Sequence, residues 1–239
     1  MVSNDVEALE VGAACDALLL TAKARMIATM TVWRRGADDF LLLTEPSLEA
    51  RVLAELRRFR FAAKAEIEPE AHVSTLVLGA PAPAGAVPNA DYGEAAYEVL
   101  DAPAPDAAEI EEAELERLRI LARTPAMGRE IDDRVLPAEA GLEERAISFT
   151  KGCYPGQEPV ARLHYRGHAN RGLRVLELEG DGLPAYDAEL TAGDAVVGRV
   201  TSAVGTGNGT VVALGYVRRE VPPDAELVLA GSRQARQLR

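Results

Sequence analysis

Cysteine is scarce in this chain, which has only two such residues, Cys15 and Cys153, among 239. Two thiols cannot build a disulfide framework or a four-cysteine zinc site within one chain. This usage is typical of proteins from a reducing compartment. No apolar run is long enough to cross a bilayer, and the first ten residues carry acidic groups where a signal peptide needs positive charge. These absences predict a cytoplasmic protein.

Positive charge is also in deficit, since 26 Lys and Arg stand against 38 Asp and Glu, for a formal net charge of -12. This balance argues against a generally basic surface that binds nucleic acid. Hydrophobic residues, in contrast, make up 48% of the chain. They suffice for the core of one large domain or of two to three small ones. A site for an anionic ligand must therefore be a local exception.

The first 125 residues or so mix predicted strands and helices, an order typical of an α+β fold with an antiparallel sheet. Short β-prone runs lie at 17–20, 26–33, 40–43, 62–67, 73–78 and 95–100. Apolar residues from Leu48 to Phe59 recur at helical spacing and predict about four turns, with Thr44 or Ser47 as N-cap. The proline-rich stretch 79–91 predicts a loop.

A second helix is predicted around residues 110–121, with Ile110 and Leu121 among its inward residues and its charged residues forming a solvated face. From Arg171 onward the chain changes to short β-prone runs separated by glycines, at 173–178, 189–191, 195–204, 210–217 and 226–229. Several short strands within some 70 residues are typical of a small closed β-barrel or sandwich.

The segment with the most distinctive chemistry is 151–158, which reads Lys-Gly-Cys-Tyr-Pro-Gly-Gln-Glu. Its glycines and proline predict a loop, followed by a helix that starts near Gly156 with Pro159 among its first residues. Cys153 would then lie just ahead of a helix N-terminus and two residues from Lys151, and both features favour the thiolate. The alternative is that Cys153 is a small buried hydrophobe. Cys15, with no cationic neighbour in the sequence, is predicted to be structural.

Between residues 151 and 174 the local charge is +4, from five Lys and Arg against Glu158. Arg162 and Arg166 are one helical turn apart and could present their guanidinium groups together. The alternative is a solvated basic face. Cys153, His164 and His168 match no zinc-binding spacing, so no stable metal site is predicted.

The string 147–158, together with Leu136-Pro137-Ala138-Glu139-Ala140-Gly141-Leu142, Ala161-Arg162 and Arg166-Gly167, closely resembles the YgfZ family of folate-binding proteins. These are relatives of the glycine-cleavage T-protein, and they are implicated in the maturation and repair of iron–sulfur clusters and, through cluster enzymes, in tRNA modification. The resemblance extends more weakly to both ends of the chain.

The resemblance implies an α+β fold with two subdomains of the T-protein type and a small C-terminal antiparallel β-barrel around a folate cavity. The expected boundaries are 1–80 for the first subdomain, 81–165 for the second, which carries the motif, and 166–239 for the barrel. Family members usually begin some tens of residues earlier, so the first subdomain is expected to be N-terminally shortened. T-proteins also carry a paired Asp-Asp where Ala28 and Thr29 stand here, which argues against aminomethyltransferase activity.

The resemblance thus implies a tetrahydrofolate-binding accessory protein for the assembly or repair of [4Fe-4S] proteins, rather than a self-sufficient enzyme. Cys153 would be the reactive thiol and Lys151 its partner. The residues expected to contact folate are Glu139, Tyr154, Gln157, Glu158, Arg162 and Arg166. The two arginines could instead orient the motif loop, and the alternative for Glu139 is a helix-capping or solvated glutamate. Expected partners are iron–sulfur enzymes or their assembly proteins, without a membrane or direct tRNA binding, and the chain is expected to be a monomer. Two alternatives are a folate-dependent one-carbon transferase and an RNA-binding module that uses Arg162, Arg166, Arg171 and Arg174.

Overall fold

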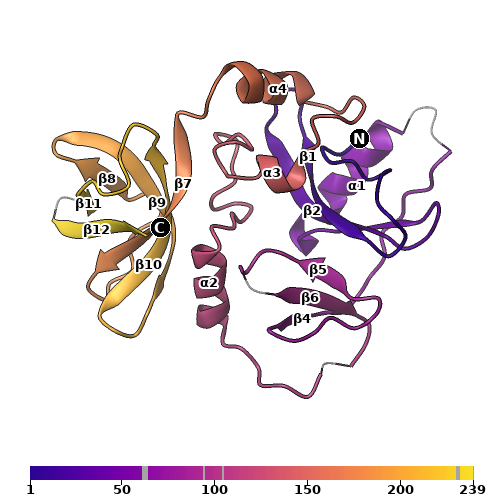
Figure 1. Cartoon of the computed structure of the whole chain (residues 1–239), viewed down its shortest axis with the longest axis horizontal. Helices are drawn as coiled ribbons and strands as arrows, with labels where there is room; N and C mark the ends of the chain where they lie inside the picture. The colour runs from indigo at the N-terminus through magenta and orange to yellow at the C-terminus, as the bar shows by residue number, and fades with distance from the viewer. Residues whose placement is uncertain (61–63, 94, 104, 230–231, 239) are drawn as a thin grey trace. The chain divides into compact units, whose positions relative to one another are not determined.

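A computed structural model describes residues 1–60, 64–93, 95–103, 105–229 and 232–238. It divides into two compact units, each assembled from separate stretches of the chain (Figure 1). The first unit comprises Met1–Asn89, Ala96–Pro105 and Leu142–Gly167, and the second comprises Ala90–Ala95, Asp106–Gly141 and His168–Arg239. Within the described ranges, no helix combines the length and the apolar character needed to span a bilayer. The three-part division by sequence stays a prediction.

The core of the first unit is an antiparallel sheet of three strands in the order β1-β2-β3. These strands are Ala14–Leu20, Met26–Arg34 and Phe40–Leu43, which confirms the three predicted runs. The short 3-10 helix η1 (Pro46–Leu48) leads into α1 (Glu49–Arg58), whose Val52 and Leu56 belong to the same hydrophobic cluster as the sheet. Helical spacing of the apolar residues therefore predicted the buried face of α1 correctly.

The predicted start and length of α1 are wrong. The helix has ten residues, or about three turns, and neither Thr44 nor Ser47 caps it, because its N-cap residue is Leu48 and makes no side-chain cap bond. Thr44 instead donates its hydroxyl hydrogen to the carbonyl oxygen of Thr29, at 2.9 Å. A long-range partner in the sheet has thus replaced the local cap.

The first unit also contains a second sheet, in the order β4-β6-β5. Its strands are Ser74–Leu78, Ala96–Leu100 and Val87–Asn89. The last of these lies within the predicted loop 79–91, so that prediction is wrong at β5; Pro88 is tolerated because β5 is an edge strand. Of the predicted strand 62–67, residues 62 and 63 lie outside the described residues, and 64–67 form no regular structure.

A surface cluster ties this second sheet to the β2–β3 turn. His72 lies between two carboxylates, with Nδ1 at 2.5 Å from Asp101 and Nε2 at 3.1 Å from Glu70. Glu70 in turn accepts two hydrogen bonds from the guanidinium of Arg35. The two carboxylates raise the pKa of His72, because they stabilise its protonated form.

The second unit is dominated by a closed antiparallel barrel, in the order β10-β7-β12-β11-β8-β9 (Figure 1). Its strands are Arg171–Glu179, Glu189–Ala192, Ala195–Gly205, Thr210–Arg218, Leu227–Leu229 and Arg233–Leu238, for β7 to β12. The predicted barrel is confirmed. Sequence periodicity missed β12 because its residues Arg-Gln-Ala-Arg-Gln-Leu are mostly polar, although Ala235 faces the barrel core.

Helix α2 (Glu112–Leu121) packs on β9 and β10 of the barrel. The predicted inward positions are wrong at both ends, where Ile110 and Leu121 are exposed. The prediction that its charges are all solvated is also wrong, because Arg119 is buried. Its guanidinium donates to Glu130 at 3.1 Å, to Glu116 at 2.7 Å and to the Ser202 hydroxyl at 2.8 Å.

Glu130 is the acidic centre of this buried network and has no exposed surface. Besides Arg119, its carboxylate accepts hydrogen bonds from the Thr201 hydroxyl at 2.6 Å and from the Ala126 amide at 3.0 Å. A buried charge is tolerated only when it is paired and hydrogen-bonded, as it is here. The network therefore fastens α2 and the 124–131 loop to the barrel.

Candidate functional site

The motif segment lies in the first unit and consists of a loop followed by α4 (Gln157–Arg166). The predicted helix start near Gly156 is confirmed, with Gly156 as the N-cap and Pro159 as the third helical residue. Gly156 has a φ of +83°, and a Cβ atom added to it would lie 2.5 Å from the carbonyl oxygen of Thr21 and 3.1 Å from Ala24 Cα. Only glycine fits without displacing one of the two backbones, so the loop sits directly on the turn between β1 and β2.

Lys151 anchors the loop to the N-terminal segment of the chain. Its Nζ donates hydrogen bonds to the carbonyl oxygens of Val2, at 2.9 Å, and Asn4, at 2.8 Å. The backbone amide of Ser148 adds a bond to the Ser3 carbonyl at 3.0 Å. Partial burial lowers the pKa of Lys151. The ammonium group of Lys151 is thus hydrogen-bonded to backbone carbonyls of the N-terminal segment.

Cys153 is exposed and reduced, and its contact is the side chain of Gln157. The Gln157 Nε2 atom lies 3.5 Å from Cys153 Sγ, while Gln157 Oε1 accepts a hydrogen bond from the Tyr154 backbone amide at 3.1 Å. The predicted alternative of a buried Cys153 is therefore wrong. The Tyr154 side chain is buried, which raises the pKa of its phenol, and Lys151 Nζ lies 5.9 Å from the centre of its ring.

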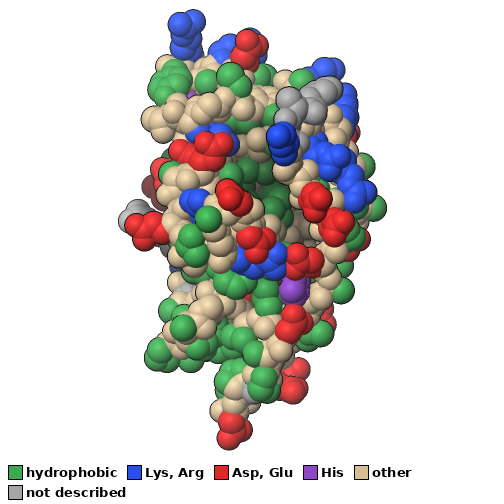
Figure 2. All heavy atoms as spheres, turned by 90° about the vertical axis from the view of Figure 1, so that its right-hand side faces the viewer, with side chains coloured by type: hydrophobic (Ala, Val, Ile, Leu, Met, Phe, Trp, Pro, Cys, Tyr) green, Lys and Arg blue, Asp and Glu red, His purple; other side chains and the backbone are tan. Residues whose placement is uncertain are grey.

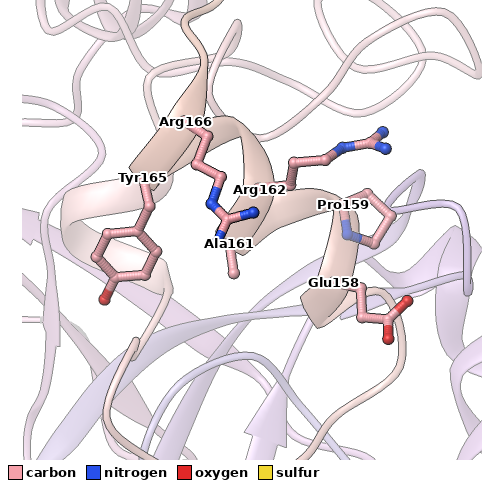
Figure 3. Close-up of a pocket in the computed structure, with 6 residues that line it drawn as sticks. All are labelled: Glu158, Pro159, Ala161, Arg162, Tyr165 and Arg166. Atoms are coloured by element: carbon pink, nitrogen blue, oxygen red, sulfur yellow. The ribbon is translucent and has the colours of Figure 1, made fainter.

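One face of α4 borders an open hollow of about 420 Å³ (Figure 3). Arg162 and Arg166 lie on this face one turn apart, and neither has an ion pair or a side-chain hydrogen bond with any residue that the structure describes. Figure 3 shows the Arg166 guanidinium folded back over Ala161, whereas Arg162 extends past Pro159. Glu158 and Tyr165 complete the lining. Both guanidinium groups are thus unpaired among the described residues, and anion binding by them stays a prediction.

An aromatic group that sequence reasoning missed lies beside this face. The rings of Phe149 and His164 are stacked with centroids 3.9 Å apart, and Tyr165 meets both of them edge-on. His164 also lies 3.9 Å from Glu143 in α3 (Glu143–Ala146). The sequence signal was the adjacent pair His164-Tyr165 on an exposed helix. Its partner Phe149 is separated from it by the whole motif loop.

Glu139 lies in the second unit, where its carboxylate already has partners. It accepts hydrogen bonds from Arg171 at 2.9 and 3.2 Å and from the Leu136 amide at 3.0 Å. The other predicted site residues thus lie together in the segment 151–166 of the first unit, whereas Glu139 belongs to the second unit. It also shows that the +4 segment is no single free patch, because Lys151 and Arg171 are both engaged.

Cys15 is less exposed than Cys153. It lies half-buried on β1, and burial raises the pKa of its thiol to about 11. Cys15 has no cationic neighbour in the sequence, but the fold brings Lys151 close enough to oppose this rise in pKa. Burial is the larger effect, so Cys15 stays a thiol near neutral pH.

The described part of the chain contains no group of three or more His, Cys, Asp or Glu residues that could hold a metal ion. Charged side chains of both signs are interspersed over the face shown in Figure 2. The chemistry available at the motif is therefore that of one exposed thiol, one amide and two free guanidinium groups.

Comparison with known proteins finds relatives for part of the chain. It is 39% identical over 100 residues to the tRNA-modifying protein YgfZ of Edwardsiella ictaluri, covering 40% of this chain and 30% of that protein. It is 35% identical over 117 residues to a chloroplastic protein of Arabidopsis thaliana whose name proposes a transferase, covering 48% of this chain and 26% of the relative. The matches thus span about a quarter to a third of these relatives. No family model matches the chain.

Among solved structures, the aminomethyltransferase T of the glycine cleavage system from Bartonella henselae is similar in fold. It matches with a TM-score of 0.80 and 18% sequence identity, covering 99% of this chain and 77% of that chain. At this identity the similarity establishes the fold alone, and it confirms the predicted α+β architecture of the T-protein type with a terminal barrel.

Proposed function

The chain is a relative of the YgfZ proteins, as its motif predicts, and on that premise we propose that it is a tetrahydrofolate-binding accessory protein. It would assist the assembly or repair of [4Fe-4S] proteins through Cys153, and so support tRNA modification indirectly. The proposed partners are iron–sulfur enzymes or their assembly proteins. The proposed setting is the cytoplasm, where reducing conditions keep the thiol free.

The observation that carries this proposal is the exposed Cys153 thiol in the loop that precedes α4. A thiolate is the nucleophilic and metal-ligating form of cysteine, and an exposed thiol is open to substrates and clusters. Cys153 could therefore make transient contact with a cluster, a sulfur species or a one-carbon unit that is delivered as substrate. Buried Cys15 lacks the exposure that this role needs.

The residues of α4 fit one part of a folate. The glutamate tail carries carboxylates, and Arg162 and Arg166 offer two free guanidinium groups beside a hollow of about 420 Å³. Arginine binds carboxylates with paired hydrogen bonds. Glu139 fits a pterin ring less readily, since the ring would have to share that carboxylate with Arg171. When bound, the folate would supply a one-carbon unit.

A one-carbon transferase is the second candidate, because of the T-protein fold and the name of the Arabidopsis relative. The residues that stand in place of the T-protein Asp-Asp pair argue against transferase activity. Ala28 is fully buried on β2 and Thr29 follows it, so neither supplies a carboxylate for amine transfer. Turnover of methylene-tetrahydrofolate with an amine acceptor by the purified chain would favour this candidate over the accessory role.

Complementation tests the role of the thiol. In a strain that lacks the protein, Cys153→Ala should fail to restore the activity of cluster-dependent enzymes, whereas the matched Cys15→Ala should restore it if the protein accumulates normally. Full restoration by Cys153→Ala would refute the proposal.

Calorimetric titration with tetrahydrofolate tests the ligand. Arg162→Gln combined with Arg166→Gln should weaken binding at least about tenfold, because charge-assisted hydrogen bonds to a carboxylate are lost. Arg51→Gln, which removes an exposed arginine from α1, is the control and should leave the affinity unchanged. Absence of binding to the unaltered chain would remove the folate from the proposal.

A further inference from the structure

We infer that Gln157 is the positioning residue of Cys153, holding the thiol in place and presenting a hydrogen-bond donor to its sulfur. The inference rests on the proposed function only in taking Cys153 as the reactive group. It assigns to Gln157 a role different from the folate contact that the family resemblance implies.

The geometry fixes which end of the Gln157 amide faces the sulfur. The Tyr154 backbone N–H needs an acceptor, and Gln157 Oε1 supplies it at 3.1 Å. An amide has its oxygen and its nitrogen at opposite corners, so Nε2 is left to face Cys153 Sγ, at 3.5 Å. Reversal of the amide would place two donors against each other at Tyr154. The loop backbone thereby dictates the orientation of the donor.

The chemical consequence concerns the ionised form of the thiol. The Gln157 amide donates to sulfur, and a donor stabilises a negatively charged acceptor more than a neutral one. The charged residues of the motif are less well placed for this role. Lys151 directs its ammonium to the carbonyls of Val2 and Asn4, and Glu158 is exposed on α4.

The position of Gln157 on α4 places its backbone next to a close contact with the β1–β2 turn. Gln157 is the first residue of the helix, directly after Gly156, and Gly156 is wedged against the turn between β1 and β2. The side chain therefore extends from an anchored backbone, four positions after the cysteine in the chain. A side chain held at both of its polar ends can position the thiol without contacting a substrate.

The test measures alkylation of Cys153 by iodoacetamide in the full-length protein, read by peptide mass spectrometry. Gln157→Glu keeps an acceptor for the Tyr154 amide but replaces the donor to sulfur with an oxygen. Gln157→Met removes both hydrogen bonds and adds no charge. Near pH 7 both variants should react roughly three- to tenfold more slowly than the unaltered protein, since less thiolate is present. Near pH 10.5 all three proteins should react within about twofold of one another, because the thiol is then largely ionised.

Three results would overturn the inference. Equal rates near pH 7 would show that the donor has no effect on the sulfur. Slow reaction at both pH values would indicate altered access instead of altered ionisation. Slow reaction of Gln157→Glu alone would assign the effect to the added charge. Gln234→Glu, an exposed change on β12 of the second unit, controls for net charge and should leave the rates unchanged.

The assay is independent of folate and of any client protein. If Cys153→Ala fully restored activity in the complementation experiment, the proposed function would be refuted, but the alkylation result would still report on Gln157. If the alkylation rates were equal, the positioning role would fail while the proposed function remained open to its own tests. Cys15 serves as an internal reference, because its pKa of about 11 keeps it slow to react near pH 7.

Discussion

Replacement of Gly156 by alanine tests how tightly the motif loop is seated. The substitution places a Cβ atom on a residue with a φ of +83°, which costs roughly 1–2 kcal/mol for an L-residue other than glycine. The same Cβ would lie 2.5 Å from Thr21 O and 3.2 Å from Ala24 N. Both neighbours are backbone atoms, so relief requires a shift of the loop or the turn, at a cost of about 1–3 kcal/mol. The free energy of unfolding should therefore fall by about 2–5 kcal/mol.

Gly85→Ala is the matched control for this experiment. Gly85 has a φ of +82° in the same unit, but a Cβ atom there would meet no atom within 4 Å. Gly85→Ala therefore has the same backbone strain as Gly156→Ala but no steric clash. Both variants also lose conformational entropy of the unfolded chain to the same extent. Urea unfolding can be followed through Trp33, the single tryptophan, which lies on β2 of this unit. A Gly156→Ala variant no less stable than Gly85→Ala would refute the close contact between the loop and the turn.

Three further perturbations have defined outcomes. Lys151→Met removes two charge-assisted hydrogen bonds and should lower the free energy of unfolding, measured in urea, by about 1.5–3 kcal/mol. The control Lys23→Met, at an exposed position, should change it by less than about 0.5 kcal/mol. Equal effects of the two variants would contradict the anchoring of the loop by Lys151. Glu130→Ala removes one of the two carboxylates that pair with buried Arg119 and leaves the Thr201 hydroxyl and the Ala126 amide without their acceptor, so it should cost about 3–5 kcal/mol in thermal unfolding; a loss below about 1 kcal/mol would be inconsistent with the network. The folded-state pKa of His72 lies above its ordinary value of 6.5, so its stabilising contribution is present below pH 6.5 and disappears as pH rises through the folded-state pKa. The stability difference between the unaltered protein and His72→Gln should shrink as the pH rises above about 6.5; a constant difference would count against the carboxylate contacts.

Local signals in the sequence predicted the parts of the fold that depend on neighbouring residues. Glycine, proline and helix-forming residues in order were enough to place the start of α4 at Gly156. Alternating and continuous apolar runs placed β1 to β3 and most of the barrel. The one-turn spacing of Arg162 and Arg166 correctly predicted that they share a helix face.

The failures share one physical cause, which is that a distant partner outweighs a local preference. Thr44 bonds to Thr29 in the sheet instead of capping α1. Pro88 lies in a strand because an edge position needs no donor on one side. Arg119 is buried because Glu130, eleven residues away, compensates its charge. None of these partners can be identified from the periodicity of a single segment.

The same holds for the candidate site. The motif predicted an exposed thiol, but not that Lys151 would bind Val2 and Asn4. It assigned Gln157 to folate and did not predict its bonds to Tyr154 and Cys153, since these depend on how the loop bends around Gly156.

The anchoring of the motif by Lys151 has a consequence for the order in which the chain acquires its structure. Lys151 is separated by 149 and 147 residues from the two carbonyls that bind it. Contacts so distant along the chain incur a large loop-closure entropy and form late, after local structure has reduced that cost. During synthesis, the N-terminal segment must wait for residues 142–167 before the first unit is complete. The thiol at position 153 is therefore set in its final geometry only once most of the polypeptide exists, so its loop geometry serves as a marker that the first unit is complete.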